Sequence, residues 1–96
     1  MLHVVSQSPF ATDSLSLCLD YTTPGDAVLL TEDAVMAALS GTKWQSTLES
    51  CGAECFVLQE DLQARGVESR VEPSIKVIDF SGFVLLTEAH STQMKW

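Results

Sequence analysis

The stretch "DAVLLTEDAVMAAL", residues 26–39, joins two different patterns of apolar residues. Its first half is a run of consecutive apolar residues, which is typical of a parallel strand that helices cover on both faces. Its second half opens with Glu32 and Asp33, which suit the first turn of a helix because acidic side chains interact favourably with the helix dipole there. A buried strand that leads directly into a helix predicts a βα unit.

The same alternation continues in both directions along the chain. Residues 2–5, 54–58 and 75–80 predict further buried strands, and the segments that separate them have helical spacing. Gly52 is placed to end a helix in a left-handed cap, and Ser81 is placed to begin the last helix. The expectation is a single α/β domain over residues 1–96, a three-layer sandwich around a mostly parallel sheet of four to five strands.

The charge of the chain argues against several classes of partner. Thirteen acidic residues oppose five scattered basic ones, for a formal net charge of -8. Direct binding to nucleic acid or to an anionic membrane surface is therefore disfavoured, since both depend on clustered Lys and Arg. The longest apolar runs are far shorter than the roughly 20 residues of a membrane helix, and the first residues lack the pattern of an export signal. We expect a cytoplasmic protein with reduced cysteines.

Motifs for cofactors and metals do not emerge. The glycines stand singly, so no phosphate-binding loop is predicted. His3 and His90 lie far apart, and the C-x3-C pair of Cys51 and Cys55 lacks the second ligand pair of a zinc site. The expectation is that the protein uses no cofactor and no metal.

The cysteines and one acidic pair are the remaining candidates for chemistry. Cys55 alternates within a strand, and Cys51 ends a helix between two acids, so neither is expected to be reactive. Cys18 lies in the body of the first helix without a basic neighbour in sequence, which favours a packed thiol over a nucleophile. Glu32 and Asp33 follow a strand where α/β sheets place ligands, although a helix-capping role is favoured over a small-molecule site.

Beyond these local patterns, the whole chain resembles the DsrH/TusB family of sulfur-relay subunits. The resemblance rests on "LHVV" with "SPF", then "GDAVLLTEDAVMAAL", "EDLQARG" and "VIDFSGFVLLTEAHSTQMKW", in this order. It implies an accessory subunit of a heterohexamer, with two sister chains that are similar to DsrE and DsrF (TusD and TusC). Such complexes pass persulfide sulfur to a downstream carrier protein, and the sulfur ends in 2-thiouridine at tRNA wobble positions.

The resemblance leaves two branches of the family open. The terminal "STQMKW" resembles the tRNA branch, in which the catalytic cysteine belongs to a sister subunit. A cysteine at the position of Cys18 resembles the branch of sulfur-oxidising bacteria, in which Cys18 itself would carry persulfide sulfur.

The unusual apolar end of the chain suggests where sister subunits bind. Phe83, Met94 and Trp96 are expected at or near a subunit interface, since aromatic residues and Met are enriched there. The alternative is that Trp96 folds back on its own domain.

Overall fold

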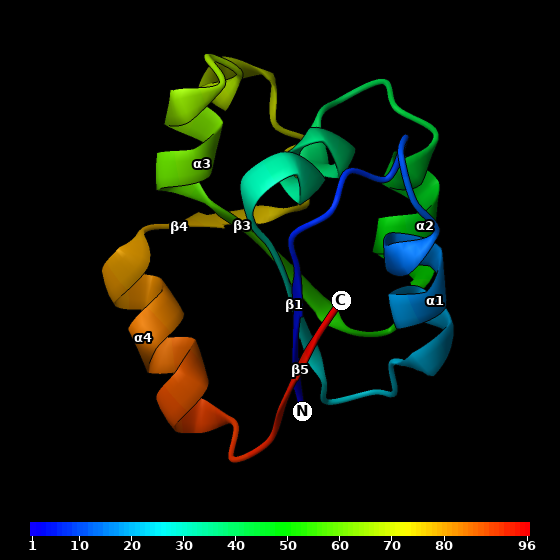
Figure 1. Cartoon of the computed structure of the whole chain (residues 1–96), viewed down its shortest axis with the longest axis vertical. Helices are drawn as coiled ribbons and strands as arrows, with labels where there is room; N and C mark the ends of the chain where they lie inside the picture. The colour runs from blue at the N-terminus through cyan, green and yellow to red at the C-terminus, as the bar shows by residue number, and fades with distance from the viewer.

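A computed structural model describes all residues from Met1 to Trp96, and it contains one sheet with helices on both faces (Figure 1). The five strands are β1 (Leu2–Val5), β2 (Ala27–Leu30), β3 (Glu54–Leu58), β4 (Lys76–Ile78) and β5 (Gln93–Lys95). The α-helices are α1 (Ser14–Tyr21), α2 (Trp44–Ser50), α3 (Gln59–Ala64) and α4 (Phe80–Ala89), and the 3-10 helices are η1 (Glu32–Ala38) and η2 (Glu68–Arg70). The predicted α/β class is confirmed.

All strands of the sheet are parallel, in the order β4-β3-β2-β1-β5. The first four follow each other outward from β1, and β5 then returns to the opposite side of β1. The strand order therefore reverses between β1 and β5, which brings the last residues of the chain beside the first (Figure 1).

Alternating side chains of the central strands enter two separate cores. His3, Val5, Val28 and Leu30 point to the face that α1 and α2 cover, and the apolar members of this set belong to a cluster of 16 buried residues. Leu2, Val4, Ala27 and Leu29 point to the other face, where the cluster has only 5 buried residues. Consecutive apolar residues in β1 and β2 are explained by this burial on both faces.

The two faces are covered to different extents. Helices α1, α2 and α3 and the 3-10 helix η1 all contribute buried side chains to the larger core, whereas α4 packs alone on the second face (Figure 1). None of the residues of α4 is buried; Phe83 and Leu86 are its half-buried contacts with the smaller core. One helix on a five-stranded sheet leaves apolar surface exposed on that side.

The helix expected after β2 is present, as a 3-10 helix. The structure corrects two other details of the sequence interpretation. The N-cap of α4 is Asp79, whose carboxylate accepts a hydrogen bond from the Gly82 N–H at 2.9 Å, and not Ser81. The fifth strand is formed by residues 93–95, for which the sequence predicted no strand, because it depends on pairing with β1.

Two glycines have conformations or contacts that the fold requires. Gly52 follows α2 with a φ of 82°, the left-handed cap that its position predicted. Gly82 lies where a Cβ atom would come within 2.9 Å of the Ile78 Cβ, so α4 packs closely on the end of β4.

None of the helices has the length and hydrophobicity that crossing a membrane would require.

The central position of β2 predicts a large difference between two leucines. Leu29 is fully buried, whereas Leu17 on α1 is 57% exposed. We expect Leu29→Ala to lower the free energy of unfolding by about 3 kcal/mol, because it removes buried methyl groups and leaves a cavity. The matched Leu17→Ala variant is expected to change it by less than about 0.5 kcal/mol. Urea denaturation monitored by circular dichroism measures both, and equal losses would contradict this description of the core.

Candidate functional site

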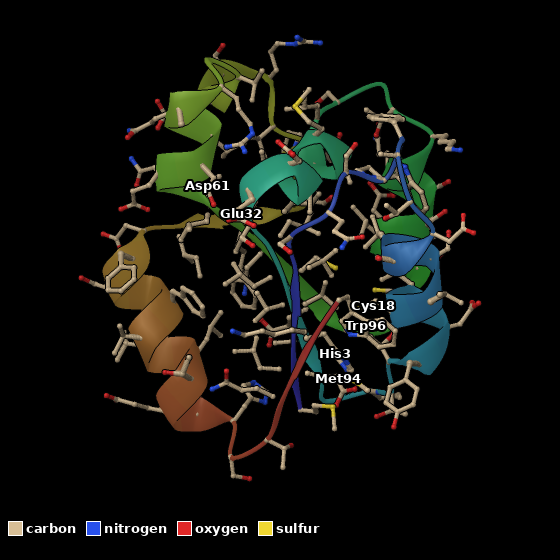
Figure 2. All side chains as sticks on the ribbon, viewed as in Figure 1. His3, Cys18, Glu32, Asp61, Met94 and Trp96 are labelled. Carbon is tan, nitrogen blue, oxygen red and sulfur yellow. The ribbon has the colours of Figure 1, made fainter.

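A chain of hydrogen bonds connects the two ends of the protein through a buried histidine. The indole Nε1 of Trp96 donates to His3 Nδ1 at 3.2 Å, and His3 Nε2 lies 2.9 Å from Asp26 Oδ2. The N-terminal ammonium of Met1 donates to the other carboxylate oxygen of Asp26 at 3.0 Å. Figure 2 shows His3 and Trp96 together on the side of β1 that faces α1.

The partners of His3 determine which ring nitrogen carries the proton. An indole N–H can only donate, so His3 Nδ1 must accept and is therefore unprotonated. The proton of the neutral ring then lies on Nε2, from which it is donated to the Asp26 carboxylate. Both polar atoms of a fully buried side chain are thus satisfied.

Asp26 is held in its ionised form by this network. The hydrogen bond from His3, the bond from the Thr23 N–H and the N-terminal ammonium together keep the pKa of Asp26 well below its usual range. Sequence reasoning assigned His3 a structural role without identifying its partners. The available signal was a histidine inside the apolar run "LHVV", which needs a polar partner at each ring nitrogen when it is buried.

The end of the chain folds onto its own domain. The Trp96 N–H donates to the Val4 carbonyl at 2.9 Å, and the Ser6 N–H donates to the Trp96 carbonyl oxygen at 3.3 Å. The indole ring packs against the larger core, with its centroid 5.9 Å from the exposed Tyr21 ring. Trp96 remains half-exposed, so an outer partner can still reach part of it.

The three residues expected at an interface lie on two different faces. Phe83 packs on the small core under α4. Met94 is paired with His3 in the sheet, and Trp96 follows it on the same side, toward α1 (Figure 2). All three are half-buried. They therefore do not form one continuous surface.

The most exposed apolar residues of α4 form a patch that sequence reasoning did not single out. Phe80, Val84 and Leu85 are 62%, 40% and 65% exposed. We refer to these three residues as the α4 patch. Its signal in the sequence was the run "FVLL" at residues 83–86, with Phe80 three residues before it. Apolar residues at these positions lie on more sides of the helix than packing against a single core requires.

The environment of Cys18 disfavours a thiolate. Its side chain is fully buried in the larger core. Burial, with smaller effects of Cys51 and Asp26, raises the pKa of the Cys18 thiol to about 12. The thiol is therefore protonated at neutral pH and has no access to solvent, which agrees with the packed role that its sequence surroundings favoured.

The other two cysteines form a close pair. Cys51 Sγ lies 3.7 Å from Cys55 Sγ, and both side chains are half-exposed with free thiols. Burial and the neighbouring Cys51 raise the pKa of the Cys55 thiol to about 12. Cys55 also lines a cavity of about 370 Å³ beside Lys76, Glu49 and Glu54. Sequence reasoning considered these residues as a C-x3-C pair for metal binding alone, expected neither to be reactive, and did not predict the contact between the two thiols.

The acidic pair after β2 takes part in contacts between η1 and α3. The Asp33 carboxylate accepts from Arg65 Nη2 at 2.9 Å, and the Glu32 N–H donates to Asp61 Oδ2 at 2.6 Å (Figure 2). Glu32 has a φ of 49°, a strained conformation for a residue with a side chain. Both acids lie in the first turn of η1, but neither caps it, because the N-cap residue is Thr31 and no side-chain hydrogen bond caps this helix.

A second cavity, of about 320 Å³, lies at the carboxyl ends of the central strands. Its polar lining consists of Ser6, Thr31, Glu32 and Lys95, beside Phe83 and other apolar side chains. No cysteine or histidine lines it, and no group of three or more His, Cys, Asp or Glu residues in the structure is arranged to hold a metal ion. The crevice offers one cation and one carboxylate but no nucleophilic thiol.

The ionised state of Asp26 predicts a specific pH dependence of stability. Because its pKa is lowered in the folded protein, Asp26 stabilises the fold above the unfolded-state pKa, and this contribution is lost as the pH falls. We expect the wild type to exceed Asp26→Asn by about 2 kcal/mol near pH 5, and this difference to fall steadily as the pH is lowered below about 4 toward the folded-state pKa. Denaturant unfolding across this pH range measures the difference. Asp20→Asn, at an exposed position on α1, is the control and should show no such trend.

Comparisons with known sequences and structures agree with this fold. The family described as "DsrH like protein" matches residues 7–93. The chain is 38% identical to Protein TusB of Photorhabdus laumondii and 41% identical to Protein TusB of Escherichia coli O1:K1, in both cases over 96 residues and 100% of each chain.

Solved structures with low sequence identity have the same fold. The chain resembles the ychN protein of E. coli with a TM-score of 0.79 at 15% identity, covering 99% of this chain and 97% of that one. It resembles the protein MTH1491 of Methanobacterium thermoautotrophicum with a TM-score of 0.68 at 10% identity, covering 99% and 96% of the two chains. The parallel sheet with its helical layers is thus a known arrangement, and the full-length sequence matches show that this chain belongs to the DsrH/TusB family.

Proposed function

We propose that this protein is an accessory subunit of a sulfur-relay complex that supplies sulfur for 2-thiouridine at tRNA wobble positions. Its contribution is shape and contact area for sister subunits, and the reactive cysteine of the relay belongs to one of those subunits. The observation that carries the proposal is the α4 patch, an apolar surface without a partner in this chain, in a member of the DsrH/TusB family.

The relatives and the charge of the chain support this reading. Its curated relatives carry the name TusB over their full lengths, which favours the tRNA branch over the sulfur-oxidation branch. A net charge of -8 suits a subunit that contacts other proteins and does not itself hold RNA. The complex is expected to work in the cytoplasm, where its downstream partner would be a small sulfur-carrier protein.

The α4 patch has the properties of a subunit contact. A parallel sheet is stable when helices cover both of its faces, and here one helix covers the second face alone. The exposed Phe80 ring lies 6.1 Å from the half-buried Phe83 ring, and Phe83 in turn packs on the smaller core. A sister subunit of TusC or TusD type that packs on α4 would complete this layer and cover Phe83 as well.

A second contact is expected at the edge of the sheet. Met94 in β5 and Trp96 directly after it are half-buried, and β5 has β1 on one side and no strand on the other. A chain within a heterohexamer touches more than one neighbour, so two separated surfaces fit such an assembly better than one. The terminal hydrogen-bond network would then hold Trp96 in position for its partner.

The alternative function places the sulfur carrier in this chain, at Cys18. Its thiol would have to become exposed and ionised before it could accept sulfane sulfur, because it is buried and protonated in the folded domain. A contact with a partner that opens α1 would be needed. The geometry therefore favours the accessory role.

Replacing an exposed leucine tests the interface. We expect Leu85→Asp to weaken binding to the co-expressed sister subunits by about tenfold or more, because it would bury an unpaired charge in the contact. Leu17→Asp, at a 57% exposed position on α1, is the matched control. Co-purification with light scattering measures the assembly, and circular dichroism confirms folding. A defined complex with Leu85→Asp at wild-type affinity would contradict the proposed surface.

Replacing Cys18 separates the two functions. We expect a complex assembled with Cys18→Ala to transfer sulfur to its carrier protein and to tRNA at a rate within about twofold of the wild type, because a buried protonated thiol takes no part in the relay. The readout is 2-thiouridine content, with assembly checked by light scattering. Loss of transfer in a fully assembled complex would support the Cys18 carrier instead.

A further inference from the structure

Besides the proposed interface, the structure contains a pair of thiols that the relay role does not use. We propose that Cys51 and Cys55 form a redox-active dithiol that reacts with low-molecular-weight hydropersulfides, releases their outer sulfur as sulfide and closes to an intramolecular disulfide. That persulfides occur near this protein follows from its proposed function in a sulfur relay. The reaction itself needs no other protein chain.

The distance between the sulfur atoms is the first support. Cys51 Sγ and Cys55 Sγ are 3.7 Å apart. A disulfide bond is about 2.05 Å long, so each sulfur needs to move by less than about 1 Å for the bond to form. Cys18 has no such partner at hydrogen-bond distance and is fully buried.

The local backbone allows this movement on one side. Cys55 lies in β3, where it is paired with Val28 of the central strand β2, so its position is fixed by the sheet. Cys51 is the C-cap of the short helix α2, outside the sheet, and is followed by Gly52, which has a φ of 82°. Rotation of the Cys51 side chain can therefore bring the two sulfur atoms together without displacing a core strand.

A neighbouring cavity lies against Cys55, and Cys51 is itself partly exposed. Cys55 lines the cavity of about 370 Å³ together with Ser74, Lys76, Glu49 and Glu54. This volume accommodates a small molecule, and two carboxylates against one ammonium disfavour donors with several negative charges. The expected reactant is a small hydropersulfide that carries few charges, such as cysteine hydropersulfide.

The reaction has two steps that balance in atoms and electrons. Cys51, the half-buried C-cap of α2, attacks the outer sulfur of the donor RSSH; the S–S bond of the donor breaks, RSH leaves with the proton of Cys51, and Cys51 becomes a persulfide. Cys55, whose sulfur lies 3.7 Å from Cys51 Sγ, then attacks Cys51 Sγ and gives up its proton as the S–SH bond breaks, so that the outer sulfur leaves as hydrogen sulfide. In sum, RSSH and two thiols give RSH, hydrogen sulfide and one disulfide; the dithiol loses two electrons and the sulfane sulfur gains them.

Mass spectrometry of the isolated full chain tests the proposal. After incubation with cysteine hydropersulfide, we expect a loss of about 2 Da from the intact protein and release of about one equivalent of sulfide. Peptide mapping without reduction is expected to place the new bond between Cys51 and Cys55. An unchanged mass, or a stable gain of about 32 Da on the wild type, would overturn the proposal.

Serine variants provide the controls. Cys51→Ser and Cys55→Ser are expected to form no disulfide and to release at least about tenfold less sulfide, because the bond needs both thiols. Cys18→Ala is expected to react as the wild type does. Equal sulfide release from Cys51→Ser would also overturn the proposal. Since the test uses no sister subunit, its failure would leave the assembly function untouched, and a failed assembly test would leave the dithiol untouched.

Discussion

The unequal covering of the two sheet faces is the constraint on which the rest of this structure depends. Buried parallel strands need apolar neighbours on both sides, and the chain provides these on one face with α1, α2, α3 and η1. On the other face it provides only α4, none of whose residues is buried. Among the helices of residues 1–96, α4 is the one that packs on this face. A surface that the chain cannot cover itself is the physical basis for its proposed role as a subunit.

The hydrogen-bond network around His3 stabilises β5, the short strand at the edge of the sheet. β5 contains three residues and pairs with only one neighbour, so its ladder hydrogen bonds alone would hold it weakly. The indole of Trp96 adds a bond to a buried histidine, and Asp26 with the N-terminal ammonium completes the arrangement. Both ends of the chain are thereby connected to the same carboxylate. A terminal tryptophan thus contributes to folding and can also present part of its ring to a partner.

The three cysteines illustrate how burial and proximity separate residues of one type. Cys18 is isolated within the larger core, where desolvation keeps its thiol protonated. Cys51 and Cys55 are partly accessible and lie next to each other, so oxidation of one sulfur can be completed by the other. The crevice at the carboxyl ends of the strands contains no thiol. Thiol chemistry in this chain is therefore expected away from that crevice, at the opposite, amino-terminal end of β3.

Local patterns in the sequence determined the α/β class and four of the five strands, because these follow from apolar runs, turn residues and helical spacing. They favoured a packed Cys18 but left its role as a sulfur carrier open. The full-length resemblance added the family. Only the tertiary structure decided the order of the strands, the pairing of β5 with β1, the partners of His3 and the contact between Cys51 and Cys55. It also separated Phe83 from Met94 and Trp96, which lie on opposite faces. Each of these features brings together residues that are far apart in the sequence; His3 and Trp96, for example, are separated by 93 positions. No local pattern encodes which distant polar groups will form hydrogen bonds with each other.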